Sequence, residues 1–481
     1  MALDRKGKAK PPKLAWSLKK QVGAGATLAD AAVIHSFTSA SKAQAQVVRF
    51  DLEVAQTDSE QQIFYRVGAG NTYSFVVPAR QTSPRMAYAS CNGFSDLKAM
   101  KKIRDQNALW KDVLQKHRAA PYNLLLMGGD QIYSDSMWTR VPELEAWSAL
   151  PWPERLKARF EPLRALVEEF FFRTYIDRWK QPEVAAVMGC VPTMMMWDDH
   201  DIFDGWGSYP DDQRESAVYR GIFEVASIYF RVFQLGIAPG ESRPGKIPGQ
   251  DHFSFGHKVG DVAVLALDLR SERTEKQVMS DTSWNAAAQW MEGLSDCTHL
   301  LLLSSIPVVH PDFGLVDKLL GILPGRQELE DDLKDHWHTL AHRKERLRLI
   351  HRLFTFSASK QCRVTILSGD VHVAAVGILE SQRSDGPRNS NVINQLTSSG
   401  IVHPAPPGIV LYFLESVADQ IETVDRGITA EMAEFPATSH RFIGTRNWLS
   451  LEPDPEKTLW ANWYVEDGEQ PYTKAVHRVA Q

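Results

Sequence analysis

The stretch NLLLMGGDQIY, residues 123–133, joins a short apolar run to a glycine pair and then to polar residues. A continuous apolar run of this length is consistent with a strand buried on both faces of a parallel sheet. The two glycines predict a tight turn where the strand ends. The stretch therefore favours an α/β fold in which Asp130, Gln131 and Tyr133 lie at the carboxyl edge of a sheet.

The same pattern of an apolar run followed by polar residues occurs three more times. Ser90-Cys91-Asn92 follows MAYA, Asp198-Asp199-His200-Asp201 follows TMMMW, and Gly369-Asp370-Val371-His372 follows VTILS. In α/β sheets, ligands bind at the carboxyl ends of the strands. Oxygen and imidazole donors that meet at this edge can build a metal site.

Each motif by itself has an ordinary explanation. Taken singly, Asp130 is better explained as a turn residue, Cys91 as a small buried side chain, and His372 as a hydrogen-bonded core or surface histidine. Their combination is harder to explain, because several carboxylates brought to one edge repel each other unless they are protonated or bind a cation. A bound metal is the most economical explanation. The carboxylates concerned are Asp130, Asp198, Asp199, Asp201 and Asp370.

Composition excludes several other classes of protein. The chain has 481 residues, of which 43% are hydrophobic and 23% charged, which is typical of a globular protein. A net charge of −5 gives no general basic excess, so we expect no dedicated nucleic-acid partner. The sequence shows no secretory or twin-arginine signal and no apolar run long enough to span a membrane, which predicts a cytoplasmic protein without a transmembrane segment.

The pattern along the chain predicts four parts. Residues 1–15 are expected to be a flexible tail, and residues 16–85 a small β-sandwich-like domain. Apolar runs alternate with amphipathic segments over residues 86–440, as in a large α/β domain. Residues 441–481 are expected to form a β-hairpin, from 444–451 and 459–466, and a tail packed on the large domain. Helices are predicted at 96–117, 153–180, 212–233, 331–356 and 409–433.

Three motifs together carry a more specific signal. GGDQIY, WDDHDIFDGWGS and SGDVHVA, in this order and spacing, resemble the PhoD-like (alkaline phosphatase D) branch of the calcineurin-like metallophosphatases. MAYASCNG and LDLRSERT resemble further blocks of that family, and the resemblance covers residues 86–405. It implies an αββα sandwich of two mixed β-sheets flanked by helices, with a small N-terminal all-β domain and a two-metal site at the strand ends.

The resemblance also implies a set of metal ligands. Two or more metal ions would be bound, most simply Fe³⁺ with Ca²⁺, and Mn²⁺ or Zn²⁺ are alternatives. Asp130 would bridge the two ions. The other ligands would be Cys91, Tyr133 and His372 for iron, and Asp199 and Asp370 for calcium. The chemistry of the donors agrees, because thiolate and phenolate suit a trivalent metal and carboxylates suit a hard divalent one.

A phosphoesterase reaction follows from this arrangement. Two ions activate a hydroxide for in-line attack on phosphorus, and His200 would protonate the leaving group. Arg270 and Arg273 are candidates to contact the phosphate, although the sequence fits ordinary surface arginines equally well. Candidates to support the ligands or to contact substrate are Asp204, Asn92, Gln131 and His403. The substrate would be a small-molecule or lipid-linked phosphate monoester or diester.

Two departures from the family pattern motivate an alternative. The wider superfamily has Asn where this chain has Asp199, and exported relatives often have arginine where it has Gln131. The alternative is a metal-stabilised binding protein without phosphatase turnover. The phosphoesterase hypothesis ranks above it, because a binding protein gives His200 no role. The substrate's identity and the oligomeric state are not indicated by the sequence.

Overall fold

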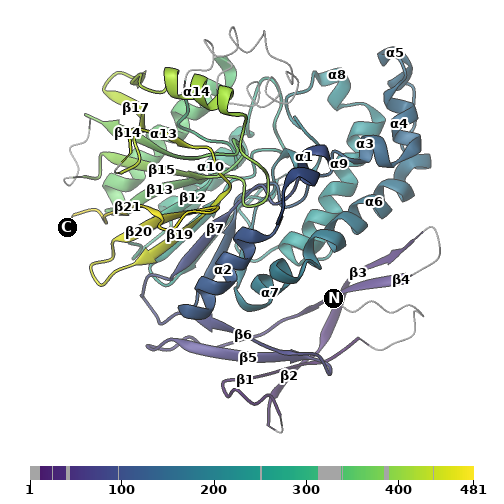
Figure 1. Cartoon of the computed structure of the whole chain (residues 1–481), viewed down its shortest axis with the longest axis horizontal. Helices are drawn as coiled ribbons and strands as arrows, with labels where there is room; N and C mark the ends of the chain where they lie inside the picture. The colour runs from purple at the N-terminus through teal and green to yellow at the C-terminus, as the bar shows by residue number, and fades with distance from the viewer. Residues whose placement is uncertain are drawn as a thin grey trace.

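Two large β-sheets lie at the centre of the protein, with helices on both sides (Figure 1). The computed structural model describes residues 11–23, 25–39, 44–95, 97–249, 252–311, 337, 340–383, 389–436 and 438–480. The sequence prediction of an α/β sandwich of two mixed sheets with an all-β region at the N-terminus is confirmed.

The first central sheet has six strands in the order β21-β20-β19-β7-β8-β9. Its parallel part consists of β7 (Met86–Ala89), β8 (Leu124–Met127) and β9 (Thr193–Met195). The antiparallel part consists of β19 (Asn447–Pro453), β20 (Leu459–Val465) and β21 (Tyr472–Val476). The predicted C-terminal hairpin is therefore present, and it extends this sheet through the pairing of β19 with β7.

The second central sheet has nine strands, in the order β10-β11-β12-β13-β15-β14-β17-β16 with β18 paired to β14. The parallel strands are β11 (Val262–Ala266), β12 (His299–Leu303), β13 (Arg363–Ser368) and β15 (Val392–Ser398). The antiparallel strands are β10 (Phe255–Val259), β14 (Ala374–Ser381), β16 (Glu422–Asp425), β17 (Ile428–Ala433) and β18 (Phe442–Ile443).

Three apolar clusters show that the sheets and helices form layers. Alternate residues of a strand point to opposite faces, so each strand contributes to two clusters. Tyr88 and Leu126 of the first sheet share a cluster with Leu301 of the second, whereas Leu125 packs with helical residues on the outer face. Leu300 belongs to a third cluster, on the outer face of the second sheet. This alternation gives the order helix, sheet, sheet, helix.

The helices that cover these faces come from the connections between strands. The layer beside the first sheet contains α2 (Ala108–Ala119) and α7 (Pro182–Cys190), and the layer beside the second contains α10 (Asp281–Glu292), α13 (Leu340–Lys360) and α14 (Gly408–Val417). A third group lies at one end of the sandwich (Figure 1). It consists of α3 (Met137–Arg140), α4 (Pro142–Ser148), α5 (Trp152–Arg155), α6 (Glu161–Trp179), α8 (Asp211–Arg214) and α9 (Ala217–Phe230).

The N-terminal region is all-β, and its strands form two separate sheets. One sheet has four strands, and the other is a hairpin that packs on the helical group, where Phe37 stacks on Phe172 at 4.1 Å between ring centroids. The four-stranded sheet consists of β1 (Leu14–Ser17), β2 (Thr27–Ala29), β5 (Gln61–Val67) and β6 (Thr72–Val77), and the hairpin of β3 (Ala31–Thr38) and β4 (Gln44–Phe50). The domain boundaries at residues 15, 85 and 440 stay predictions.

The predicted helix at 409–433 is wrong in its second half. Helix α14 ends at Val417, and β16 and β17 follow as a hairpin that turns at Gly427, where φ is +73°. Residues 428–433 alternate between buried and more exposed positions, which is the period of a strand.

Three other predicted helices are interrupted. The stretch 96–117 forms α1 (Leu97–Lys102) and α2, and the stretch 153–180 forms α5 and α6. The stretch 212–233 forms α8, α9 and a π-helical turn at Arg231–Leu235. The helix predicted from 331 is described from Leu340 onward, and its first part lies outside the described residues.

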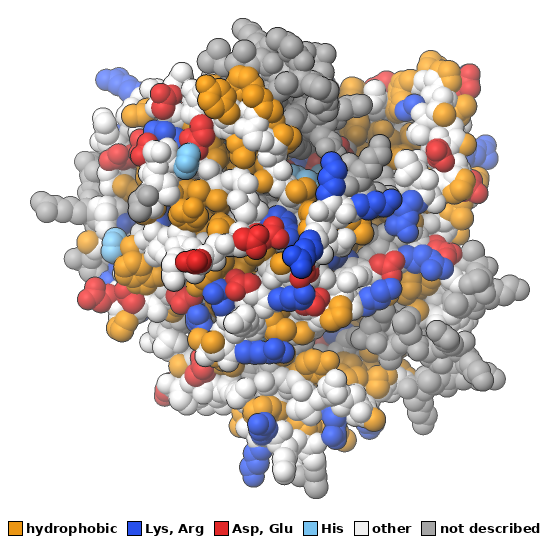
Figure 2. All heavy atoms as spheres, viewed as in Figure 1, with side chains coloured by type: hydrophobic (Ala, Val, Ile, Leu, Met, Phe, Trp, Pro, Cys, Tyr) orange, Lys and Arg blue, Asp and Glu red, His pale blue; other side chains and the backbone are white. Residues whose placement is uncertain are grey.

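The surface agrees with the near-neutral composition. On the face shown in Figure 2, positive and negative side chains are interspersed, and hydrophobic side chains gather over α14. The exposed apolar residues there include Ile409 and Tyr412. Within the described part of the chain, no helix combines the length and the apolar character needed to cross a bilayer.

Candidate metal centre

The predicted metal ligands lie in loops after β7, β8, β9 and β13, where strand ends of the two sheets meet, whereas Arg270 and Arg273 follow β11 and His403 follows β15. Four of these residues have left-handed backbone conformations: φ is +54° at Cys91, +55° at Asp130, +71° at Asp370 and +53° at His372. Such conformations are strained for residues other than glycine and persist only where the surrounding structure imposes them. The fold thus holds four chemically active side chains at the same edge in strained loops, which is a common feature of functional sites.

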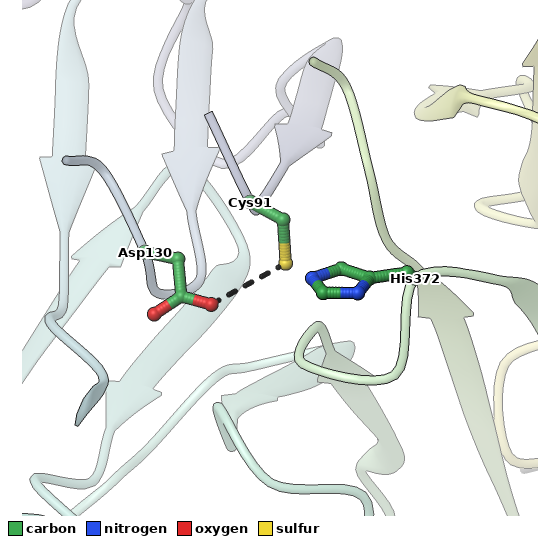
Figure 3. Close-up of side chains that lie close together, drawn as sticks. All are labelled: Cys91, Asp130 and His372. Carbon is green, nitrogen blue, oxygen red and sulfur yellow. Dashed lines mark hydrogen bonds between the residues drawn. The ribbon is translucent and has the colours of Figure 1, made fainter. Parts of the chain in front are cut away.

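Cys91, Asp130 and His372 form the first group of potential metal ligands (Figure 3). One donor atom from each lies within 4.8 Å of the others. The Cys91 thiol lies 3.6 Å from Asp130 Oδ2. The Tyr133 hydroxyl joins the group, since it lies 3.5 Å from Asp130 Oδ2 and 3.2 Å from His372 Nε2. Sulfur, phenol, imidazole and carboxylate donors therefore face one another.

Asp130 also belongs to a second group, which contains only carboxylates. Oxygens of Asp130, Asp198, Asp199 and Asp370 lie within 4.8 Å of one another, and all four side chains are buried. Asp130 is common to both groups and to a third one, which consists of Asp130, Asp199 and His200, so it lies where a single residue could contact two ions. Asp198 belongs to this group in addition to the predicted ligands.

Arg270 is the counter-ion of the carboxylate group. Its side chain is fully buried and donates through Nε to Asp198. Its Nη2 lies 3.3 Å from Asp199 Oδ1 and 4.0 Å from Asp370 Oδ1. One guanidinium among four carboxylates leaves a large negative charge in a buried place, where charge is poorly solvated.

Buried carboxylate oxygens of the group, among them Asp130 Oδ1, Asp198 Oδ2 and Asp199 Oδ1, have no hydrogen-bond partner among the described residues. Burial raises the pKa of Asp130 well above its ordinary value and that of Asp198 to about 6, while it also raises the pKa of the Cys91 thiol. Open oxygens and unfavourable negative charge are both relieved by a bound cation. The residues present therefore fit a pair of metal ions.

His200 is held by a carboxylate that the sequence interpretation missed. Asp135 Oδ2 lies 2.7 Å from His200 Nδ1, and its Oδ1 accepts a hydrogen bond from the backbone N–H of Asp204 at 2.8 Å. Burial lowers the pKa of His200, but the carboxylates of Asp135, Asp199 and Asp130 outweigh it and raise this pKa well above its ordinary value. The surrounding carboxylates therefore favour the protonated form of the imidazole.

Comparison with known proteins agrees with this geometry. The family model described as PhoD related phosphatase matches residues 56–324 and 312–432, which is well over half of the chain. The chain belongs to this family. An uncharacterized protein of Saccharomyces cerevisiae is 28% identical to this chain over 499 residues, which cover 84% of this chain and 70% of the yeast protein.

Solved structures of other proteins resemble this chain to different degrees. The structure of PhoD matches with a TM-score of 0.54 at 13% identity, covering 98% of this chain and 83% of PhoD, so the two proteins share a fold. A dimetal phosphatase of Danio rerio matches more weakly, with a TM-score of 0.37 at 10% identity, covering 82% of this chain and 99% of the other.

The acidic loop after β9 contains one carboxylate, Asp201, that belongs to none of the potential ligand groups among the described residues. Asp201 accepts hydrogen bonds from the backbone N–H groups of Gln131, Ile132 and Asp198 and from the Gln234 side chain. These bonds tie the loop after β8 to the loop after β9. Burial raises the pKa of Asp201 to about 7.

Asn92 and Gln131 are both buried next to the ligand loops, and only Asn92 makes side-chain hydrogen bonds there among the described residues. Asn92 Oδ1 accepts hydrogen bonds from Trp110 Nε1 at 2.8 Å and from Arg178 Nη2 at 2.6 Å, which turns this amide away from the ligand groups. Its Nδ2 donates to the backbone carbonyl of Gln131 at 3.3 Å. Gln131 is fully buried, so it cannot replace an exposed phosphate-binding arginine.

Three further predicted residues have different positions. His403 lies in the site, where its ring stacks on His372 at 3.6 Å, and burial lowers its pKa to about 4. Asp204 belongs to none of the potential ligand groups found among the described residues, and its backbone supports Asp135. Arg273 is fully buried, as is Arg270, so the interpretation of both as surface arginines is wrong. Arg273 Nη2 lies 3.5 Å from a nitrogen of His342.

Proposed function

We propose that this chain is a metal-dependent phosphoesterase that uses two metal ions at the centre described above. The observation that carries the proposal is the place of Asp130, a buried carboxylate shared by both ligand groups with one oxygen open. Membership of the PhoD related phosphatase family supports the reaction class.

The donors divide by chemistry into two ion sites. Cys91, Tyr133 and His372 would hold a ferric ion together with Asp130, and Asp199 and Asp370 would hold a calcium ion with the same bridge. Mn²⁺ or Zn²⁺ are the alternatives. When bound, two such ions activate water for in-line attack on phosphorus and stabilise the charge that develops there.

Arg270 binds and orients the phosphate. Its Nε is fixed by Asp198, and its Nη2 is directed toward the space between Asp199 and Asp370. A guanidinium held in this way adds a charge-assisted hydrogen bond to a phosphate oxygen.

His200 transfers the proton to the leaving group. Asp135 occupies Nδ1 of the imidazole, which leaves Nε2 to donate the proton to the departing oxygen. Tyr133 stacks on the His200 ring at 4.3 Å and His403 stacks on Tyr133 at 5.3 Å. These rings keep the imidazole in place and exclude water from one of its faces.

The first experiment measures bound metals and turnover on the same protein. Wild type purified without a histidine tag is analysed for metals by mass spectrometry, then assayed on bis-p-nitrophenyl phosphate and p-nitrophenyl phosphate. The test variant is Asp130→Asn, and the matched control is Asp419→Asn, which changes an exposed carboxylate. The expected result is iron and a divalent ion in wild type and control, with both metals and diesterase activity lost in Asp130→Asn.

Two other results have definite meanings. Metals bound without turnover on either ester, after resupply of calcium, iron, manganese and zinc, would favour the metal-stabilised binding protein. Failure to retain any metal after reconstitution would refute the interpretation of the acidic cluster. The relative rates on the two esters assign the preference between diesters and monoesters, and small-molecule and lipid-linked esters can then be compared directly.

A further inference from the structure

Two cysteines that lie far apart in the sequence are in contact at the end of the second sheet that is remote from the metal centre. Cys297 precedes β12, Cys362 precedes β13, and these strands pair in parallel. The two Sγ atoms lie 3.0 Å apart, and both cysteines are free thiols. A disulfide bond is about 2.05 Å long, so the two sulfur atoms need to approach by only about 1 Å to become bonded.

The backbone on both sides of the pair is fixed by the sheet. The N–H of Thr298 donates to Asp261 O at 2.8 Å, and the N–H of Arg363 donates to Thr298 O at 2.9 Å. Small rotations of the two side chains can therefore bring the sulfur atoms together while the strands keep their register.

The two thiols differ in access to solvent. Cys362 is fully buried, whereas Cys297 is half-buried and lines a polar hollow of about 390 Å³. The charged residues of the hollow have both signs: Lys360, Lys457 and Arg478 line it together with Asp261 and Asp296, and Lys457 pairs with Asp261 at 2.8 Å. A low-molecular-weight disulfide such as glutathione disulfide can reach Cys297 from this hollow but not Cys362.

Cys297 is the better placed of the two thiols to act as the nucleophile. The thiolate is the form that attacks disulfides, and only Cys297 can be reached from the hollow. Lys258 and Lys360 favour the thiolate of Cys297, and the contact between the two sulfur atoms links their titration.

We propose that Cys297 and Cys362 are a redox-active pair that forms a reversible intrachain disulfide with low-molecular-weight disulfides. The Cys297 thiolate attacks one sulfur of glutathione disulfide, which breaks its S–S bond and releases one glutathione. The Cys362 sulfur then attacks Cys297 Sγ, and its proton leaves with the second glutathione. The two cysteines lose two electrons and two protons, and glutathione disulfide is reduced to two thiols.

This site is independent of the proposed catalysis. The thiol pair lies before β12 and β13, whereas Asp370 and His372 follow β13. A strand advances about 3.3 Å per residue, so the six residues of β13 separate the two sites by about 20 Å. Oxidation of the pair can therefore be measured without reference to phosphoesterase activity.

The test uses the full chain and glutathione disulfide as the probe. After incubation, intact mass and peptide mapping under thiol-blocking conditions identify the products. The expected product in wild type is a chain lighter by two hydrogen atoms, with the Cys297 and Cys362 peptides linked, and dithiothreitol restores the starting mass. Cys362→Ser is expected to stop at one glutathionyl group on Cys297, and Cys297→Ser to remain unmodified.

Cys190→Ser is the matched control, since Cys190 is a half-buried thiol whose pKa is raised by burial. We expect this variant to give the same cross-link as wild type. The wild-type measurement stands even where a variant fails to fold. The proposal would be overturned by a wild-type chain that keeps glutathione on Cys297 without forming the cross-link, or by a pair that stays reduced in excess glutathione disulfide.

Discussion

Replacement of Asp135 by Asn tests the proton transfer proposed for His200 most directly. The carboxylate makes two hydrogen bonds, one with His200 Nδ1 at 2.7 Å and one with the backbone N–H of Asp204 at 2.8 Å. An asparagine of the same shape can keep the second bond through its oxygen. The asparagine has no negative charge. In the wild type that charge keeps a proton on His200 Nδ1 and raises the pKa of the imidazole.

The size of the effect follows from the first bond. A hydrogen bond to a charged group contributes about 1.5–3 kcal/mol, and each 1.36 kcal/mol changes a rate by about a factor of ten. We therefore expect kcat to fall by about ten- to a hundred-fold when the leaving group needs a proton. An alkyl phosphate ester needs that proton, whereas p-nitrophenolate leaves readily without one, so the fall on p-nitrophenyl esters should be much smaller.

The assay compares kcat on an alkyl and a p-nitrophenyl phosphate ester for wild type, Asp135→Asn, His200→Gln and the double variant, with metal content measured in each. Removal of Asp135 should have little further effect once His200 is gone, because the carboxylate acts through the imidazole. The reasoning is refuted if Asp135→Asn slows both substrates equally with full metal content, or if the two changes are additive in the double variant.

Three further outcomes are expected. Cys91→Ser removes the sulfur donor and should release the ferric ion while the divalent ion stays, which elemental analysis distinguishes from the loss of both ions in Asp130→Asn. Gly129→Ala places a Cβ 2.9 Å from that of Asp198 at a φ of +127°, and it should reduce stability by about 1–3 kcal/mol along with activity; an unchanged urea midpoint would contradict this. Burial lowers the pKa of His299 to about 4, from 6.5 in an unstructured chain. The stability that the neutral His299 ring contributes is therefore fully present above pH 6.5 and is lost as the pH falls through 4. The loss is about 3 kcal/mol, and His299→Gln should flatten the urea stability profile between these pH values.

The convergence of the site residues could be predicted because it depends on local patterns. Each apolar run identifies a buried strand, and parallel strands deliver the residues that follow them to one edge of a sheet. Cys91 and Asp130 follow neighbouring parallel strands of the first sheet, so this rule predicts that they lie close together. His372 follows a strand of the second sheet, and its approach to Asp130 was implied only by the family resemblance. Their roles as metal ligands stay predictions until the metals are measured.

Other features depend on contacts between distant segments, and no local pattern reveals them. Asp135 lies in a polar loop and resembles any turn residue until the fold brings His200, 65 positions later, against it. The pairing of Cys297 with Cys362 depends in the same way on the register of β12 and β13. The stretch 409–433 was ambiguous for another reason, since its apolar residues fit both helical and strand periods and Gly427 is the only strong break.

The carboxylates in and beside the acidic loop after β9 differ in how many of their oxygens accept hydrogen bonds, and this difference separates supporting residues from proposed ligands. Asp201 has both oxygens engaged by backbone N–H groups and Gln234, and this arrangement satisfies a buried carboxylate without any ion. Asp198 and Asp130 each retain a buried oxygen without a partner among the described residues. A fold that only needed to hold its loops together would have no reason to leave these oxygens open at a cost in stability. The carboxylates with open oxygens are those that would bind cations in the proposed centre, and Asp201, whose two oxygens are both engaged, ties together the loops that carry them.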